Sequence, residues 1–386
     1  MRLLSPTSGR PLMPAGPHAL RDDRGERWPI VAGIPYLRAG RASLAASLLT
    51  SLDAGDHDAA LLLALGDQDD WDPTPPPDEG ACALAIAAPT LRSAMAALGF
   101  GPVGDYFAYR WSDPTFLSGL GLLDAGLAGA SRVFELGCGI GHFLRELEAR
   151  GVTAAGGDVV FAKLWLARRF VVPSAELVCF DAGRHFPLAD DSADACLCHD
   201  VLHYLPDVAH ALTELRRVGG RVLIGHAHNA EVDNLSPGAP LDLAGYAAIA
   251  PDATFYDDAA VGRAALDESA PAAADPQHLR AAAAIAFVTP AASATAAGAD
   301  RFVVPAPGVR LRLNPLLHPL PGDPAPMVVR WPSPRYEREY ADLSAHLRNP
   351  PPVPRALLTS GVRAGEDQRA DALARQRVLL DLPDAW

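Results

Sequence analysis

The sequence predicts an α/β fold whose centre is a doubly wound, mainly parallel sheet formed by residues 131–228. Apolar runs of strand length in this region, "RVFEL", "AELVCFD", "ADACLCHD" and "GRVLIGHAH", alternate with helical patterns. Strands that alternate with helices indicate right-handed βαβ units and therefore parallel pairing. A glycine-rich stretch, "ELGCGIG" at 135–141, follows the first strand and precedes a helix, which is typical of a ligand-binding loop.

Composition limits the partners that the chain can have. The 386 residues include 33 Lys and Arg against 46 Asp and Glu, a formal charge of −13, so a nucleic-acid partner is not expected. The sequence has no apolar run of about 20 residues and no signal-peptide pattern, which favours a cytoplasmic protein without membrane contact. The five cysteines form no CxxC pair and are interpreted as reduced, buried thiols.

Residues 1–40 are expected to form a small β-rich domain. Short apolar pieces are broken by turn residues, and "RWPIVAGIPYL" reads as a strand, a glycine turn and an extended exit. The stretch resembles the zinc-ribbon-like domain of methyltransferase activator proteins, which also precedes some bacterial methyltransferases. Ser5 and Ser8 stand where that family has cysteines. Because a hydroxyl is a poor zinc ligand, the resemblance implies a domain without metal.

The segment 41–100 is predicted to be helical and to include a linker. Leucines at three- and four-residue spacing over 41–66 indicate two short helices, broken at 53–55. The acidic, proline-rich stretch 67–80 is a loop or linker, and a helix is expected over 81–98. The aromatic segment "GDYFAYRW" then leads into the main domain, expected at 101–345.

Beyond residue 228 the signals are weaker. Residues 229–300 are interpreted as an insertion on the substrate side, within which "AAAAIAFVTPAASATAAGAD" fits a buried helix or a loop. "RFVVPAPGVRLRLNPLL" reads as a hairpin that could supply the antiparallel last pair of a mixed sheet. Residues 346–386 are expected to form a proline-interrupted tail that ends in a helix.

The residues on the glycine loop indicate what it binds. An anionic Glu135 at the end of the first strand would repel a pyrophosphate and suits a ligand that carries positive charge. Asp158, nineteen residues after Gly139, ends the second strand, where a carboxylate can accept hydrogen bonds from both ribose hydroxyls. Asp181 ends the third strand, within reach of an adenine amino group. The glycines are interpreted as positions that admit close approach of the ligand.

"VFELGCGIG", the acid at 158, "FDAGRHFPLADDSADACLCHDVLHYLPD" and "ELRRVGGRVLIG" resemble, in order and spacing, the motifs of class I S-adenosylmethionine-dependent methyltransferases of type 11/25. The resemblance implies a Rossmann-like mixed seven-stranded sheet and S-adenosylmethionine as cofactor. A dinucleotide-binding dehydrogenase is the alternative, but the motif is ExGxGxG rather than GxGxxG. The resemblance implies that the cofactor is bound by Tyr106, Glu135, Gly137, Cys138, Gly139, Gly141, Asp158, Val159, Asp181, Ala182 and His199.

Catalytic groups are expected where the fourth and fifth strands end. Histidine suits general-base work near neutral pH, and His203 is the first candidate, followed by His228. For each of them, packing or capping is the alternative role. "CHDVLHYL" and "GHAHN" also contain Asp200, Tyr204, His226 and Asn229. His226 and His228, at alternate positions, could bind a metal with His199 or His203, but no carboxylate pattern accompanies them, and no metal is expected.

These observations predict an enzyme that transfers a methyl group from S-adenosylmethionine to a small metabolite, at oxygen, nitrogen or carbon. An RNA or protein methyltransferase is one alternative, because the N-terminal resemblance points towards that machinery. A catalytically degenerate cofactor-binding or scaffold protein is another. The sequence leaves open whether the protein forms a homodimer.

Overall fold

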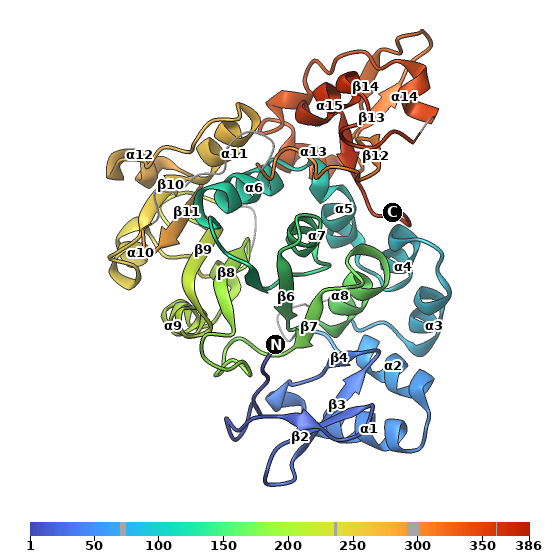
Figure 1. Cartoon of the computed structure of the whole chain (residues 1–386), viewed down its shortest axis with the longest axis vertical. Coiled ribbons are helices and arrows are strands. Elements are labelled where there is room, and N and C mark those ends of the chain that lie inside the picture. The colour runs from blue at the N-terminus through green and yellow to red at the C-terminus, as the bar shows by residue number, and fades with distance from the viewer. Residues whose placement is uncertain (70–74, 235–237, 292–300, 360) are drawn as a thin grey trace.

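The computed structural model describes residues 1–69, 75–234, 238–291, 301–359 and 361–386 (Figure 1). Its centre is a seven-stranded mixed sheet, which confirms the expected fold class. The strands run in the order β10–β11–β9–β8–β5–β6–β7. They are β5 (Arg132–Leu136), β6 (Thr153–Asp158), β7 (Glu176–Cys179), β8 (Ala193–His199), β9 (Gly219–His228), β10 (Thr254–Asp257) and β11 (Ala284–Thr289).

The pairing of these strands puts their carboxyl ends along one edge. Strands β7, β6, β5, β8 and β9 are mutually parallel, whereas β11 is antiparallel to both β9 and β10. Glu135 in β5 lies level with Gly156 of β6 and Leu197 of β8. Residues that follow β5, β6, β7, β8 and β9 therefore meet at the same side of the sheet, where ligands bind in open α/β folds.

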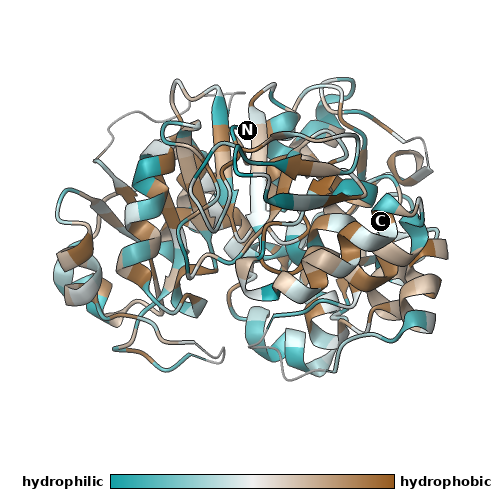
Figure 2. Ribbon diagram, turned by 90° about the horizontal axis from the view of Figure 1, so that it is seen from below, coloured by the Kyte–Doolittle hydropathy of each residue, from teal (hydrophilic) through white to brown (hydrophobic). Residues whose placement is uncertain are grey.

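Helices cover the sheet, and nearly every residue of the inner strands is buried. This burial explains why the strands read as continuous apolar runs rather than as alternating patterns. Figure 2 shows hydrophobic residues along the strands and hydrophilic ones mainly in peripheral loops and outer helix faces. The helices are α6 (Pro114–Gly126), α7 (His142–Glu148), α8 (Phe161–Leu166) with a π-helical turn (Ala167–Val171), α9 (Val208–Val218), α10 (Leu243–Ile249), α11 (Asp258–Leu266) and α12 (Pro276–Ala281).

The N-terminal residues form a four-stranded antiparallel sheet that adjoins the main one. Its strands are β1 (Met13–Pro14), β2 (Ala19–Arg21), β3 (Arg27–Val31) and β4 (Ile34–Pro35). Just after β4, Tyr36 forms a parallel bridge with Cys179 of β7, and the Leu37 N–H donates to the Cys179 carbonyl at 2.7 Å. Leu3 bridges Leu188 as well. The N-terminal unit therefore pairs with the edge strand of the main sheet, which would otherwise be exposed.

Hydroxyl groups occupy the two positions where the zinc-ribbon pattern has cysteines. Ser5 Oγ donates to Glu26 Oε2 at 2.8 Å, and Ser8 Oγ donates to Asp22 Oδ2 at 2.8 Å. These hydrogen bonds tie the first turn of the unit to the β2–β3 turn. The zinc-ribbon relationship of residues 1–40 stays a prediction.

The helical segment after the N-terminal unit agrees with prediction except at one break. The two helices expected over 41–66 are α1 (Ala42–Asp53) and α2 (His57–Leu65), preceded by a 3₁₀ turn, η1 (Ala39–Arg41). The single helix expected over 81–98 is two, α3 (Glu79–Ala87) and α4 (Leu91–Ala97). Ala88 is extended (ψ 134°) because Pro89 follows it. Residues 70–74 of the expected linker lie outside the described part. The next elements are α5 (Gly101–Tyr109) and η2 (Arg110–Ser112).

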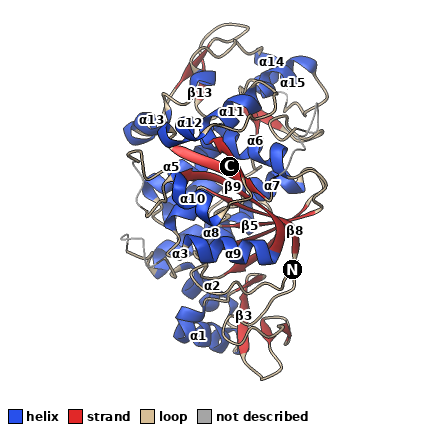
Figure 3. Cartoon of the chain, turned by 90° about the vertical axis from the view of Figure 1, so that its left-hand side faces the viewer, coloured by secondary structure: helices blue, strands red, loops and turns tan. Residues whose placement is uncertain are grey.

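The C-terminal residues form a second packed unit, at the opposite end of the molecule from the N-terminal sheet (Figure 3). Buried Leu311, Val353, Leu373 and Val378 belong to one hydrophobic cluster, so residues on both sides of the boundary expected at 345 pack together. The elements are β12 (Leu311–Leu313), β13 (Leu317–Pro319), β14 (Met327–Val329), α13 (Pro334–Tyr340), η6 (Ala345–Leu347), α14 (Arg355–Thr359), α15 (Gln368–Arg375) and β15 (Leu379–Asp381).

Two sequence interpretations of this half were wrong. The hairpin expected at 301–317 does not supply the antiparallel end of the sheet, because β12 pairs with β15 and the last pair is β10 with β11. The alanine-rich stretch expected to be a helix or loop contains β11, whose six residues are all buried. Its later residues, 292–300, lie outside the described part. Among the described helices, none is long and apolar enough to cross a bilayer.

Candidate active site

The loop between β5 and α7 has three glycines in the left-handed region, with φ of 67° at Gly137, 52° at Gly139 and 84° at Gly141. A Cβ atom at Gly137 would lie 2.5 Å from Val201 Cγ2, and one at Gly141 would lie 2.8 Å from Val172 Cγ1. Of the three glycines expected to admit close approach of a ligand, Gly137 and Gly141 therefore have a further reason to be glycine. At two of them the protein's own side chains and the backbone conformation already exclude a side chain.

An aromatic side chain covers the middle of the loop. A Cβ atom at Gly139 would lie 3.1 Å from Cε1 of Phe107, which α5 places over the loop. The backbone of Phe107 is held in place by His142, whose Nε2 lies 2.9 Å from the Phe107 carbonyl oxygen. The expected aromatic, Tyr106, is half-buried, and its hydroxyl donates to Asp200 Oδ2 at 2.7 Å. The structure thus brings Tyr106 to the end of β8 and Phe107 to the loop.

Glu135 is the least satisfied charged group of the loop region. Glu135 is the penultimate residue of β5 and is only 3% exposed, and its Oε2 is buried without a hydrogen-bond partner among the described residues. Burial raises the pKa of Glu135 to about 8, although the nearby Arg110 lowers it. A cationic ligand group beside Oε2 would favour the ionised carboxylate. Cys138 is also buried, and burial raises the pKa of its thiol, which keeps it from being a reactive thiolate.

Asp158 is the last residue of β6, the strand next to β5, and Asp181 follows β7, the edge strand beyond β6. Asp158 Oδ2 accepts the Gly139 N–H at 3.0 Å, and Oδ1 accepts the Val160 N–H at 2.9 Å. This acid therefore holds the glycine loop in place. Half-buried Val159 and Ala182 each follow one of the acids. Asp181 Oδ1 accepts the Gly183 N–H at 2.9 Å. Both carboxylates border the edge of the sheet at which the loop lies.

His199 lies inside the protein rather than on the surface of a pocket. Its Nδ1 is 3.0 Å from Arg110 Nη2, and its Nε2 is 3.4 Å from Ser118 Oγ. Burial, together with the nearby Arg110 charge, lowers the pKa of His199 to about 3. Sequence reasoning missed Arg110, which is 4% exposed and 3.5 Å from Asp200 Oδ2. The signal was present: Arg110 is the only cation within the aromatic stretch "YFAYRW".

The two predicted catalytic histidines lie together. His203 lies in η4 (Leu202–Tyr204), and its ring stacks on that of His228, at the end of β9, with centroids 3.7 Å apart and planes 12° apart. His203 is fully buried, and neither ring nitrogen has a hydrogen-bond partner among the described residues. Burial lowers the pKa of His203 to about 3 and that of His228 to about 4, with a neighbouring histidine adding to each effect. Both imidazoles are therefore neutral at pH 7.

Two other residues of these segments differ in their surroundings. Asn229 is fully buried, and its Nδ2 donates to the carbonyls of Leu279, Arg280 and Ala282, so its amide holds the turn that leads into β11. Tyr204, by contrast, is 38% exposed.

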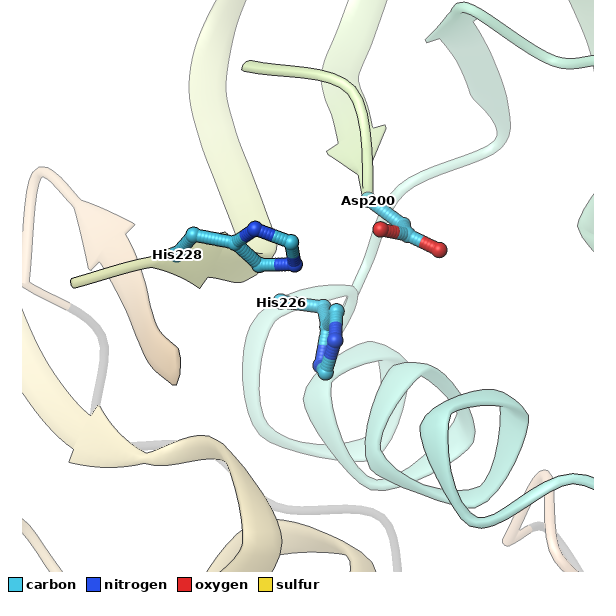
Figure 4. A group of neighbouring side chains, drawn as sticks. All are labelled: Asp200, His226 and His228. Carbon is cyan, nitrogen blue, oxygen red and sulfur yellow. The ribbon is translucent and has the colours of Figure 1, made fainter. Parts of the chain in front are cut away.

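His226 is paired with a carboxylate that sequence reasoning missed. Its Nδ1 lies 2.7 Å from Asp258 Oδ2, at the start of α11, and its backbone N–H donates to Asp258 Oδ1 at 2.9 Å. Asp258 had no sequence signal, because residues 229–300, which contain it, were interpreted only as an insertion on the substrate side. Ligating atoms of Asp200, His226 and His228 all lie within 4.8 Å of one another (Figure 4). A separate hollow of about 240 Å³, lined by Arg132, Thr153 and Ala193 among others, lies at the amino ends of the strands, away from these groups.

Comparison with known families identifies the central segment. Residues 134–224 match the family model described as "Methyltransferase domain". This central segment is similar to methyltransferase domains. This match covers the glycine loop, the acids at 158 and 181, and β8 with His199, and it ends at residue 224, before His226 and His228 of β9. It agrees with the methyltransferase core that the sequence motifs of this segment predict.

Curated relatives match a similar segment. The biotin biosynthesis bifunctional protein BioHC of Cellvibrio japonicus is 30% identical over 116 residues, which are 29% of this chain and 21% of the relative. The malonyl-[acyl-carrier protein] O-methyltransferase of Yersinia pestis is 30% identical over 106 residues, 27% of this chain and 39% of the relative. The match thus spans well under half of either relative.

Solved structures resemble the chain only distantly. A phosphoethanolamine N-methyltransferase 2 of Haemonchus contortus, in complex with S-adenosyl-L-methionine, has a TM-score of 0.35 and 16% identity, over 54% of this chain and 60% of that chain. The complex of the Haloferax volcanii Trm112 methyltransferase activator with its putative methyltransferase has a TM-score of 0.33 and 18% identity, over 54% and 99%.

Proposed function

We propose that this protein transfers a methyl group from S-adenosylmethionine to a small-molecule acceptor, at an oxygen, nitrogen or carbon atom. The observation that carries the proposal is Glu135, a buried carboxylate with an unpartnered oxygen beside a glycine loop in a methyltransferase domain. Such a group is costly in an empty protein and is stabilised by a ligand that brings a cation. The cofactor supplies the methyl group, activated on a sulfonium.

The cofactor-binding roles follow from the strand ends. Glu135 accepts the methionine-side ammonium, and Asp158 accepts from the ribose while it keeps its bond to the loop at Gly139. Asp181 and Ala182 bind the adenine, with Val159 packed against its ring. Gly137, Cys138 and Gly141 give the loop the shape that leaves room for the ligand. Phe107 and Tyr106 together cover the bound cofactor with aromatic rings. His199 does not touch the cofactor and instead positions Arg110.

Alignment and proton removal are the tasks left to the chain, because methyl transfer is an in-line displacement. His203 and His228 are neutral imidazoles at the ends of β8 and β9, so each can accept a hydrogen bond or a proton from an acceptor. Their low pKa values make them weak bases. They therefore suit an acceptor whose proton is already acidic, or an amine that needs only alignment.

A small acceptor is favoured over a macromolecular one by charge and by enclosure. The formal charge is −13, which opposes binding of a polyanion such as RNA. The side chains of Asp200 and His226 are only 16% and 19% exposed, so the acceptor has to enter a confined space. A buried arrangement of this kind fits a metabolite rather than the flat surface of a folded protein.

The proposal is tested with S-adenosylmethionine that carries a labelled methyl group. The wild-type chain is incubated with an extract of its host, and the extract is separated into metabolite, protein and RNA fractions. We expect label in the metabolite fraction, with none from the Glu135→Gln variant. Label in the RNA or protein fraction would show that the acceptor is a macromolecule rather than a metabolite. No label in any fraction, together with no binding of the cofactor to folded protein, would favour a scaffold instead.

A further inference from the structure

We propose that Asp200, His226 and His228 form a binding site for one divalent first-row transition-metal ion beside the methyl-transfer pocket. Asp200 directly follows β8, and the two histidines end β9, the neighbouring parallel strand. Their ligating atoms lie within 4.8 Å of one another (Figure 4). Ligands about 2.1 Å from a tetrahedral ion are about 3.4 Å apart, so small side-chain rotations complete the site. The sequence lacked a carboxylate pattern because Asp200 joins the histidines only through strand pairing.

Outer residues already orient the proposed ligands. Asp258 accepts from His226 Nδ1 at 2.7 Å and is itself 3% exposed. A histidine that binds metal usually gives its other ring nitrogen to a carboxylate in this way, which fixes the tautomer and aims Nε2 at the ion. Tyr106 likewise donates to Asp200 Oδ2 at 2.7 Å, and Arg110 lies 3.5 Å from the same oxygen. His226 and Asp200 are therefore each oriented by a hydrogen bond to a residue that would not itself bind the ion.

A further observation is the fully buried His203, whose ring stacks on His228. Neither of its nitrogens has a hydrogen-bond partner among the described residues, an arrangement that is unfavourable for a buried polar group. A hydrated ion held by His228 would bring water or acceptor oxygens close enough to satisfy this ring. The orphaned imidazole is thus explained by a ligand at this place.

The backbone at two of the ligands is also unusual. Asp200 has φ of 59° and His226 has φ of 48°, both in the left-handed region, which residues other than glycine rarely adopt. The conformation turns the His226 ring out of the regular alternation of β9, so that the rings of His226 and His228 meet edge to face with centroids 5.4 Å apart. Two imidazoles that meet in this way can ligate one ion from different directions.

The donor set selects the class of ion. Two imidazoles and one carboxylate suit Zn²⁺, Mn²⁺ or Fe²⁺ rather than Ca²⁺ or Mg²⁺, which prefer oxygen ligands. Three protein ligands leave coordination positions open, as in catalytic rather than structural sites. If the proposed methyl transfer holds, an acceptor hydroxyl bound at an open position would lose its proton more easily, and His228, as a ligand, would then not act as a base. This last step rests on the proposed function, whereas the metal site does not.

The test measures metal binding directly, without S-adenosylmethionine. Metal-stripped, folded full-length protein is titrated with Zn²⁺ in a calorimeter, and Co²⁺ is used as a spectroscopic probe of the ligand field. We expect one ion per chain, with visible Co²⁺ bands of a nitrogen- and oxygen-ligated site. His228→Gln and Asp200→Asn should each weaken binding at least 100-fold, and Asp258→Asn by about 10–100-fold.

The half-buried His18 and the exposed His57, whose ring centroids are 4.3 Å apart, provide the matched control. His57→Gln should leave the tight site unchanged. Circular dichroism of each variant verifies that it is folded. The proposal is overturned if folded wild type binds no tighter than His228→Gln, or if only His57→Gln abolishes binding. Cofactor binding, measured separately, shows whether a failure concerns the metal site or the methyltransferase itself.

Discussion

At the scale of single residues, the unpartnered oxygen of Glu135 connects stability with ligand binding. Burial raises the pKa of this carboxyl to about 8, so the folded state retains a proton that the unfolded state loses near pH 4.5. Between these two values the folded protein binds more protons than the unfolded chain, and its stability therefore falls as pH rises. Glu135 therefore lowers the free energy of unfolding at neutral pH. It provides a carboxylate that a cationic ligand can stabilise in the ionised form.

Glu135→Gln should make the protein more stable than wild type above about pH 6, by a few kcal/mol at most. The difference should shrink towards pH 4.5, because both side chains are then neutral. Urea denaturation over pH 4.5–8.5 measures it. Glu337→Gln, on the exposed side of α13, is the control and should follow wild type. A Glu135→Gln protein that is less stable than wild type at pH 8 would show that the carboxylate has a partner.

At the scale of elements, the strands of the core could be predicted from sequence, whereas the end of the sheet could not. "RVFEL" and "ADACLCHD" are buried on both faces and bounded by turns, which is a local signal. β11 contains two alanines within "AIAFVT" and follows an alanine run, so its composition resembles a helix. Only its place between β9 and β10 makes it a strand. The contacts of Arg110 and Asp258 likewise depend on tertiary structure.

The glycine loop illustrates how a correct motif can have a different physical cause. Gly137→Ala would place a Cβ atom 2.5 Å from Val201 at φ of 67°, so we expect a loss of about 2–4 kcal/mol. Gly129→Ala, at φ of 81° with no atom within 4 Å, isolates the backbone effect and should cost only about 1 kcal/mol. Chemical denaturation compares the two variants. Equal losses would mean that packing against Val201 contributes nothing.

At the scale of the whole molecule, the N-terminal unit is held to the helical segment by a buried polar group. Asp67, after α2, accepts from the Tyr36 hydroxyl at 2.6 Å and from Arg38 Nη1 at 2.6 Å. Arg38 is only 4% exposed, so the Asp67 carboxylate, rather than water, compensates its buried positive charge. The same segment bridges β7 through Tyr36. One network thus ties together the small sheet, the helices and the edge of the main sheet.

Asp67→Asn would leave the buried Arg38 without its counter-charge and should destabilise the protein by about 3 kcal/mol. The thermal unfolding midpoint measures the effect. Asp53→Asn removes the exposed ion pair with Arg27, 2.8 Å apart, and should produce no measurable shift. If both variants unfold at the wild-type temperature, the buried network does not hold the units together.

Isothermal titration of the folded, full-length protein with S-adenosylmethionine tests the central claim most directly, namely that Glu135 and the glycine loop form the cofactor site. We expect one molecule bound per chain, with affinity at least tenfold lower for Glu135→Gln, a loss of about 1.4 kcal/mol. Glu337→Gln should bind as wild type does. No heat of binding to folded wild type, or equal affinity for wild type and Glu135→Gln, would contradict it.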